Sequence, residues 1–281
     1  KGEAIEPLSY DPARDIAFLE HELDMWYFRL VSKGWEKFAR TVNQERPELH
    51  KAVAQQLSSL RVTEILMEQV IEKLNLPHDI MKWDRDSLLR IAIELRKATK
   101  PMLVACNKID VQGAEKNFKD LKEKFKDCML VPCSAESELA LREAARHELI
   151  DYIPGEAHFK IRNEEKLNAK QKNALNFINS NVLEKYGSTG IQNILDKAVF
   201  ELLKYIAVFP VANNKLMDKD KNILPDCLLV PENTTALDFA FKVHTDIGKN
   251  FVKAIDAKTK RPVGKDYILK NGDVIEIATS K

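Results

Sequence analysis

The sequence predicts an α/β protein that also contains a helical N-terminal part and a small, strand-rich C-terminal domain. Apolar residues recur at helical spacing through residues 1–99. Two short apolar runs then alternate with helical patterns, which is typical of a parallel α/β sheet. Short strand patterns and turns follow in the last part of the sequence. We therefore expect four regions, with boundaries at residues 1–99, 100–155, 156–206 and 207–281.

The composition is that of a protein with a sizeable hydrophobic core and with too small a net charge to produce a strong electrostatic field around the whole molecule. Hydrophobic residues make up 44% of the 281 residues, and the formal net charge is +1. A nucleic acid would therefore have to be bound by a local basic patch. No apolar run approaches the roughly 18 residues of a membrane span, so we expect no membrane partner. The sequence opens without a secretory signal and without Met, and we interpret it as a fragment or an incomplete chain.

The cysteines are expected to be reduced packing residues, with a metal or disulfide role as the alternative. None forms a C-x-x-C pair, and no histidine pair at metal-ligand spacing accompanies them. A thiol in an apolar run behaves as a small hydrophobe, and reduced thiols indicate a cytoplasmic location. The four residues are Cys106, Cys128, Cys133 and Cys227.

Residues 1–99 are expected to form a helical hairpin or a small bundle. Asp11 followed by Pro12 is a typical helix start, and Gly34 interrupts the helix that follows. Thr63 and Asp84 are expected to cap two later helices. Further helical patterns run near Pro47 to Leu60, Thr63 to Leu76 and Asp84 to Lys97. The aromatic residues Trp26, Tyr27, Trp35 and Trp83 are expected to lie mainly in the core, rather than on a surface for a partner.

Residues 100–155 have the pattern of a piece of a parallel sheet. Pro101–Cys106 and Cys128–Val131 are apolar runs that fit strands buried on both faces. A helical pattern lies between them, and another is expected from about Ser137 to Ile150. The dipeptide Pro154–Gly155 then breaks the chain.

Residues 156–206 are expected to form a helical connector, in which Thr189 and Gln192 form a capping box. Residues 207–281 then change to short strands and turns. Thr235 and Asp238 mark a second capping box, and Asn271–Gly272 is a strong turn signal. Strands are expected at Ala207–Val211, Cys227–Val230, Phe251–Ile255 and Val274–Ile277, with a polar turn at Asp218–Lys221. The order β-β-α-β-β fits a small β-grasp, or ubiquitin-like, domain.

The most informative residues follow the first apolar run and read Asn107, Lys108, Ile109, Asp110. In open α/β sheets, ligands bind at the carboxyl ends of the strands. A carboxylate at Asp110 can accept from the two adjacent N–H groups of guanine, whereas adenine would place a lone pair against it. Such an unpaired buried acceptor costs about 1–3 kcal/mol. Asn107 can brace the loop and the base edge, and the stem of Lys108 can cover the base.

A second polar loop follows the second apolar run. It contains Cys133, Ser134 and Ala135, and the backbone N–H of Ala135 is placed to donate to the O6 atom of guanine. A lone N-K-x-D match is weak, and an ordinary polar strand-to-helix turn is the alternative. Two such loops after neighbouring strands favour a guanine site.

These two loops, NKID and CSA, resemble the fourth and fifth guanine-specificity motifs of translation-factor-class GTPases. The segments DPARDIAFLEHELDMW, LVSKGWEKFAR, KLNLP, YIPG and YGSTG resemble the Obg-like, YchF-type GTPase family, particularly its archaeal branch. The segment FKVHTDIGKNFVKAIDAKTKRPVG resembles a C-terminal TGS domain, a β-grasp module shared with threonyl-tRNA synthetases and alarmone synthetases. The resemblance covers essentially the whole sequence.

The resemblance implies part of a P-loop GTPase sheet, Rossmann-like in topology, with a helical insertion and a TGS domain. It implies that Asn107 and Asp110 hold guanine, that Lys108 covers it, and that Ser134 and Ala135 contact O6. It also implies GTP or GDP as ligand, with Mg²⁺. Some YchF-type members with an altered fourth motif prefer ATP, but this sequence keeps Asp110, so the resemblance favours GTP.

The sequence departs from that family in one large respect. A phosphate-binding loop needs the pattern G-x-x-x-x-G-K-[ST], and this sequence does not contain it. Gly248–Lys249 is followed by Asn250, and Gly264–Lys265 by Asp266. Without a lysine and Mg²⁺ on the terminal phosphates, phosphoryl transfer has little to stabilise it. We expect this chain alone to lack GTPase activity, with the catalytic groups and the Mg²⁺ ligands outside it.

The C-terminal domain has one basic cluster, made of Lys258, Lys260, Arg261 and Lys265. It predicts a phosphate-contacting RNA site, and a solvated hairpin is the alternative. The lone His244 is expected to be structural.

The favoured hypothesis is a monomeric GTP-binding and GTP-hydrolysing protein associated with the ribosome or translation. The rival is a non-enzymatic RNA- or ribosome-binding adaptor in which the α/β part is only a scaffold.

Overall fold

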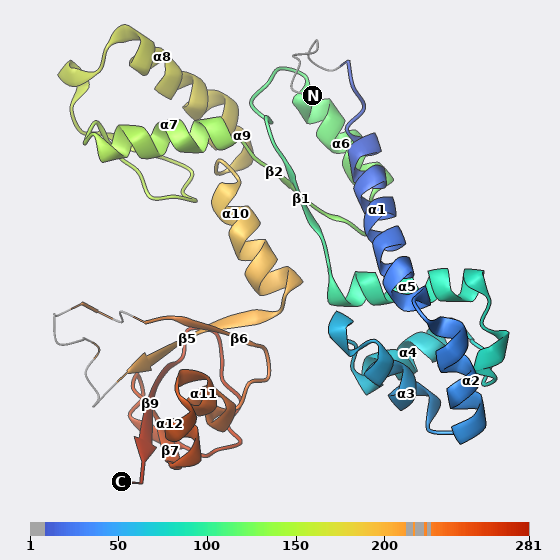
Figure 1. Ribbon diagram of the computed structural model, residues 1–281. Coiled ribbons are helices and arrows are strands. Elements are labelled where there is room, and N and C mark those ends of the chain that lie inside the picture. Colours follow the sequence, from blue (N-terminus) through green and yellow to red (C-terminus); the bar gives the residue numbers. More distant parts are fainter. Residues whose placement is uncertain (1–8, 212–215, 217–221, 224–225, 281) are drawn as a thin grey trace. The chain divides into compact units, whose positions relative to one another are not determined.

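The computed structural model describes residues 9–211, 216, 222–223 and 226–280. The chain divides into two compact units, residues 1–192 and residues 193–281 (Figure 1). The predicted polar turn at Asp218–Lys221 lies outside the described residues. The first unit contains the helical part and the parallel strands, and the second contains the β-grasp sheet.

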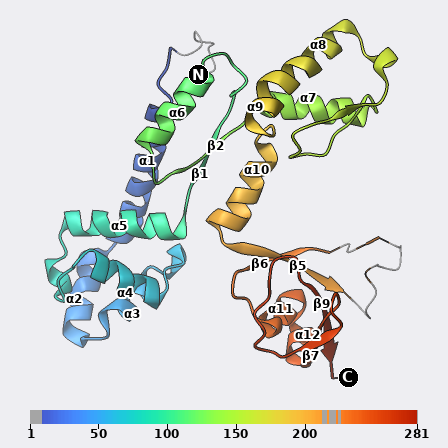
Figure 2. The same ribbon diagram turned by 180° about the vertical axis from the view of Figure 1, so that it is seen from behind.

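The helical part consists of five α-helices around one apolar core. They are α1 (Ala13–Ser32), α2 (Trp35–Glu45), α3 (Leu49–Gln56), α4 (Glu64–Lys73) and α5 (Arg85–Thr99). Helices α2 to α4 lie together beyond one side of α5, which is clear in both ribbon views (Figure 2). Short 3₁₀ turns occupy Ser58–Leu60 and Ile80–Lys82.

The helix boundaries follow from local chemistry. The carboxylate of Asp11 accepts from the N–H of Ala13 at 2.9 Å, and α1 ends before Gly34, whose φ is 70°. The predicted caps are confirmed, because the side chain of Thr63 accepts from Leu66 N and that of Asp84 from Ser87 N.

The aromatic residues of this part lie mainly in the core, as expected. Trp35 and Trp83 stack with ring centroids 5.6 Å apart, and Tyr27 is fully buried. Trp26, by contrast, is 41% exposed. Helices α1 and α5 are also joined by a partly buried ion pair, in which Arg96 Nε lies 2.7 Å from Asp24 Oδ1.

Two parallel strands carry the predicted site. Strand β1 (Leu103–Cys106) pairs with β2 (Met129–Pro132), with Cys106 opposite Pro132. Helix α6 (Ala114–Lys124) connects them, and α7 (Ala135–Arg146) follows β2. Side chains of α1 and α6 pack with these strands in one small core.

The expectation that β1 is buried on both faces is wrong. Val104 and Cys106 point into the core shared with α1 and α6, while Ala105, on the opposite face, is exposed. The reason is that, in the described part of the chain, α1 and α6 pack on the face that carries Val104 and Cys106, and the face that carries Ala105 is left exposed.

The helix expected to reach Ile150 ends at Arg146. Ile150–Asp151 is strand β3, which pairs antiparallel with β4 (Lys160–Ile161) across the Pro154–Gly155 turn. Glu148 is in the left-handed region, with φ 55°, and this break in the backbone turns an amphipathic helical pattern into a helix followed by a short strand.

The connector is helical but irregular. It contains a 3₁₀ turn (Glu164–Lys166), α8 (Ala169–Ile178), a π-helical turn (Asn179–Leu183), α9 (Glu184–Tyr186), α10 (Ile191–Asp196) and a second π-helical segment (Lys197–Leu202). The predicted capping role of Thr189 is wrong. Its hydroxyl donates to Glu138 Oε2 at 2.6 Å, and α10 begins only at Ile191.

The second unit is a five-stranded sheet in the order β6-β5-β9-β7-β8, packed against helix α11 (Ala236–Val243). The strands are β5 (Tyr205–Val211), β6 (Leu228–Pro231), β7 (Phe251–Asp256), β8 (Arg261–Val263) and β9 (Val274–Thr279). Strands β5 and β9 pair in parallel, and the other neighbours are antiparallel. The capping box of Thr235 and Asp238 and the Asn271–Gly272 turn are confirmed.

Two elements of this unit were missing from the expected order. Strand β8 is short and polar, so its pattern resembles a turn, and α12 (Thr245–Lys249) is a single helical turn. His244 caps α12, because its Nδ1 accepts from Asp246 N at 3.2 Å, and the structural role expected for it is confirmed.

Cys227 is exposed, so it is not the packing residue that we expected. All four cysteines are unpaired thiols.

Candidate functional site

The two polar loops lie side by side because β1 and β2 are parallel neighbours. The backbone N–H of Cys133 donates to Cys106 O at 3.0 Å, and that of Ile109 donates to Cys133 O at 3.1 Å. These bonds extend the strand pairing into the loops. The residues after each strand therefore meet at the same edge of the sheet, where ligands of open α/β sheets bind.

Asn107 joins the two loops directly. Its Oδ1 accepts from the N–H of Lys108 at 2.8 Å and from the N–H of Ala135 at 3.1 Å. With the oxygen engaged in this way, the amide nitrogen is left to donate elsewhere. The Ala135 N–H, which we expected to donate to guanine O6, is already donated within the protein, so a base must share this donor.

Lys108 has a backbone conformation that a lysine adopts rarely. Its φ is 65°, in the left-handed region that costs a residue with a Cβ roughly 1–2 kcal/mol. The bond from its N–H to Asn107 Oδ1 helps to hold this conformation. Its side chain is exposed. Backbone strain of this kind concentrates at ligand-binding loops.

Asp110 is half-buried, and its carboxylate makes no hydrogen bond or ion pair within the described part of the chain. Its charge nevertheless acts on its surroundings. Burial in the first place, and then the Asp110 carboxylate, raise the pKa of the Cys133 thiol. A partly buried carboxylate without a donor is unusual, because buried polar groups are normally hydrogen-bonded.

A hollow of about 600 Å³ lies between the two loops. It brings together four of the predicted residues. Its lining residues are Asn107, Lys108, Asp110, Val111, Ala135, Glu136 and Leu139. The side chain of Ser134 does not reach it. Ser134 is buried, and its Oγ accepts from Ser137 N as the N-cap of α7.

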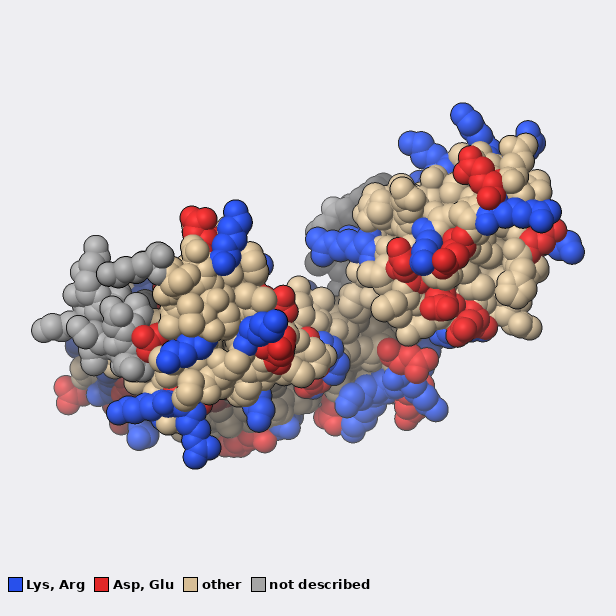
Figure 3. Space-filling model, turned by 90° about the horizontal axis from the view of Figure 1, so that it is seen from below, with Lys and Arg blue, Asp and Glu red and all other residues tan. Residues whose placement is uncertain are grey.

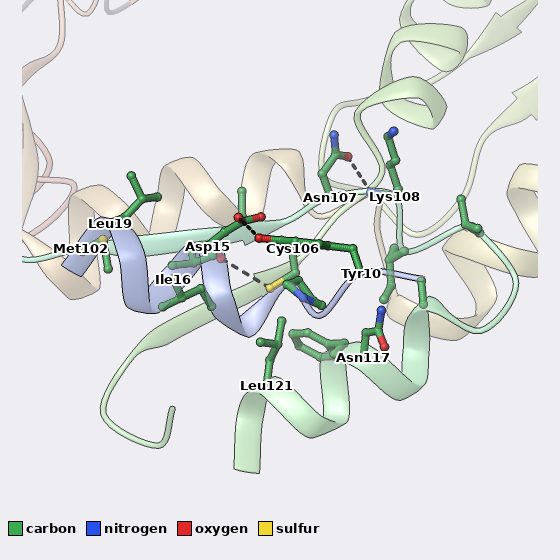
Figure 4. Close-up of a pocket in the computed structure, with 17 residues that line it drawn as sticks. Tyr10, Asp15, Ile16, Leu19, Met102, Cys106, Asn107, Lys108, Asn117 and Leu121 are labelled. Carbon is green, nitrogen blue, oxygen red and sulfur yellow. Dashed lines mark hydrogen bonds between the residues drawn. The ribbon is translucent and has the colours of Figure 1, made fainter. Parts of the chain in front are cut away.

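A second, more apolar hollow lies between α1, β1 and α6 (Figure 4). Apolar side chains, among them Ile16, Leu19 and Leu121, line it, and the rim includes Asn107 and Lys108. Asp110 and Ala135 do not line it. The polar groups suited to a base therefore converge on the first hollow, and the second continues the core of α1 and α6.

One buried carboxylate behind the site was not singled out from the sequence. Glu138, in the first turns of α7, is 4% exposed and accepts from Arg142, Tyr152 and Thr189. Burial acts to raise the pKa of its carboxyl group, but the three hydrogen bonds outweigh burial and lower it. The YGSTG segment, in which two glycines lie near Thr189, was the feature of the sequence that could have indicated a close contact in this region.

The predicted basic cluster surrounds the hairpin between β7 and β8. Lys258 Nζ donates to Gly272 O at 2.6 Å, and Lys260 is left-handed with φ 59°. Arg261 and Lys265 are exposed. On the surface drawn in Figure 3, basic and acidic side chains are mixed.

Among the described residues, no group of three or more His, Cys, Asp or Glu is arranged to hold a metal, and no described helix could cross a membrane.

Comparisons with known proteins find a matching protein family for the α/β part and another for the C-terminal part of the chain. Residues 105–213 match the family described as Obg-like GTPase YGR210-like, G4 motif-containing domain, and residues 217–279 match the TGS domain. An uncharacterized GTP-binding protein of Methanocaldococcus jannaschii is 43% identical over 97% of this chain and 68% of its own length. A second GTP-binding protein, from Schizosaccharomyces pombe, is 30% identical over 81% of this chain and 57% of its own length.

A solved GTP-binding protein of Pyrococcus horikoshii has a similar fold. It is 40% identical, with a TM-score of 0.75 over 96% of this chain and 72% of that chain. The fold is thus that of GTPase-like α/β proteins with a C-terminal TGS domain. More narrowly, the chain belongs to the Obg-like family of GTP-binding proteins.

Proposed function

We propose that this chain supplies the guanine-recognition part and the TGS domain of a protein that binds and hydrolyses GTP. The observation that carries this proposal is the Asp110 carboxylate, which has no partner among the described residues and lines a hollow braced by Asn107. Relatives whose names describe them as GTP-binding proteins support it.

The chemistry of the hollow favours guanine over adenine. The two oxygens of Asp110 accept from N1–H and the exocyclic amine of guanine, while adenine presents an acceptor at N1. The buried, unpaired acceptor that adenine leaves costs about 1–3 kcal/mol. Asn107 supplies an amide donor to the base edge, and the aliphatic stem of Lys108 lies along the base plane. Ser134 contributes through the backbone geometry that presents Ala135.

The test is a titration of the natural protein with GDP, ADP and xanthosine diphosphate. Asp110→Asn replaces one acceptor oxygen with an N–H donor, which faces the amine of guanine but suits the C2 carbonyl of xanthine. We expect the affinity for GDP to fall by about tenfold or more and the affinity for xanthosine diphosphate to rise. Asp127→Asn, at an exposed position outside the site, serves as the control. Unchanged GDP binding by Asp110→Asn would contradict the proposal.

Hydrolysis and Mg²⁺ belong to the whole protein in this proposal. When bound, Mg²⁺ neutralises charge developing on the phosphates as water attacks the γ-phosphate. The residues of this chain hold the base and orient the nucleotide, and we place the metal ligands and the phosphate-binding loop outside this sequence. We also propose a monomer in the cytoplasm, in line with the four unpaired thiols.

The basic hairpin favours a second role, contact with RNA or the ribosome through the TGS domain. Lys260, Arg261 and Lys265 are exposed, whereas Lys258 is partly engaged by the carbonyl of Gly272. A purely adaptor protein would keep this contact and bind no nucleotide. The nucleotide titration therefore separates the two functions.

A further inference from the structure

A turn distant in sequence lies directly behind the guanine loops. We propose that Ser188, Thr189 and Gly190, here called the bracing turn, form a positioning element that holds Ser134 and Ala135 in place for guanine recognition. This inference rests on the proposed function. Three separate contacts connect the bracing turn to the end of β2 and the start of α7.

The first contact is made by the backbone. The N–H of Ser134 donates to Thr189 O at 2.9 Å, and both residues are buried. Ser134 is the residue before Ala135, so this bond fixes the peptide that leads into the Ala135 N–H. The Ala135 N–H in turn donates to Asn107 Oδ1. A single hydrogen bond thus connects the bracing turn to the residue before Ala135, and Ala135 with Asn107 joins the two polar loops after β1 and β2.

The second contact is made by the Thr189 side chain. Its hydroxyl donates to Glu138 Oε2 at 2.6 Å, and Glu138 lies on the buried side of α7 in its first turns. A hydrogen bond to a charged, buried group is among the stronger ones in proteins. This bond ties the orientation of α7, whose first residue is Ala135, to the bracing turn.

The third contact is steric. Gly190 has φ 83°, and a Cβ at this position would lie 2.0 Å from Pro132 O and 2.9 Å from the Cα of Cys133. No side chain fits there unless the loop after β2 moves. The absence of a Cβ thus lets the bracing turn touch the backbone that precedes Ser134, and a substitution would push that backbone out of position.

Gly187 offers a matched control. Its φ is 75°, so alanine carries the same kind of backbone strain there, but a Cβ at Gly187 meets nothing within 4 Å. Gly190→Ala and Gly187→Ala therefore differ in the contact with the loop after β2. We expect Gly190→Ala to weaken GDP binding by about tenfold or more and Gly187→Ala by less than about threefold.

A second pair of variants covers the case in which Gly190→Ala fails to fold. Thr189→Val removes the hydroxyl with little change of shape, and Thr189→Ser restores it. We expect Thr189→Val to weaken GDP binding by about five- to tenfold and Thr189→Ser to recover most of that loss. Titrations are made in the natural protein, well below the melting temperature of each variant.

The ratio of GDP to ADP affinity distinguishes positioning from a loss of folded protein. Loss of folded protein weakens both nucleotides equally, whereas a displaced Ala135 weakens GDP selectively. If the unaltered protein does not bind GDP, the proposed function itself fails. If it does bind GDP, the inference is overturned when Gly190→Ala matches Gly187→Ala, when Thr189→Val matches the unaltered protein, or when the ratio stays constant.

Discussion

At the scale of single residues, the site combines strain with an unpaired charge. Lys108 holds φ at 65°, and Asp110 has a half-buried carboxylate to which no group in the described ranges donates. Neither feature stabilises the fold, and both suit a ligand that brings its own N–H groups and a flat face. Their place after an apolar run predicted that these residues lie at the edge of a sheet, and their role in binding guanine stays a prediction. The bond from Ala135 to Asn107 was not, because it depends on the register of two loops that are far apart in sequence.

Lys108→Gly should separate stability from binding. Glycine adopts the left-handed conformation freely, so we expect the free energy of unfolding to rise by up to about 1 kcal/mol. The same change removes the stem that covers the base, so GDP affinity should fall by several-fold. Thermal unfolding and GDP titration measure the two effects. Arg61, with φ 58° and outside the site, is the control: Arg61→Gly should raise stability alone. An increase in GDP affinity in Lys108→Gly would count against a covering role.

At the scale of elements, local signals predicted the structure well where one side chain decides a boundary. The caps at Thr63, Asp84 and Thr235 are of this kind. The predictions failed where tertiary contacts decide. Thr189 has the sequence position of a helix cap, but the buried carboxylate of Glu138 takes its hydroxyl. Strand β8 exists because β7 pairs with it, and its residues alone do not indicate a strand.

The contact between α1 and α5 includes an ion pair between a buried arginine and a partly buried aspartate. Arg96 is 4% exposed and lies 2.7 Å from Asp24, with Glu20 at 3.8 Å. We expect Asp24→Ala to destabilise the protein by about 3 kcal/mol, because it leaves a buried guanidinium poorly compensated. Urea unfolding measures the loss. Glu36→Ala, which breaks the exposed pair with Arg40, should cost under about 0.5 kcal/mol. Equal losses in the two variants would show that burial does not matter here.

At the scale of the whole molecule, the chain spans 68% of the M. jannaschii relative and 57% of the S. pombe relative. Its two compact units, divided after Gln192, contain the proposed guanine site and the TGS domain. The sequence contains no phosphate-binding loop pattern, and the groups that would act on the phosphates during hydrolysis are therefore missing from it. Under the proposed function, base recognition and hydrolysis are therefore carried by different residues and can be tested separately.

This separation predicts the behaviour of the 281-residue chain taken alone. We expect no GTP turnover above the rate in buffer with Mg²⁺, because no lysine or metal is held on the β- and γ-phosphates. Release of inorganic phosphate measures it. The natural protein, assayed in parallel, should hydrolyse GTP. Turnover by the 281-residue chain would show that a different set of residues performs the reaction.

The parallel pairing of β5 with β9 has a consequence for synthesis of the protein. β9 lies in the middle of the sheet, between β5 and β7, although it is the most C-terminal of the strands. The sheet therefore cannot close until residues 274–279 have left the ribosome, and until then β5 and β7 present unpaired edges. Domains dominated by such long-range pairing fold slowly and are prone to aggregate in the interval. We therefore expect the sheet of the TGS domain to form only after residues 274–279 have been synthesised, and its unpaired strand edges to need protection from aggregation until then.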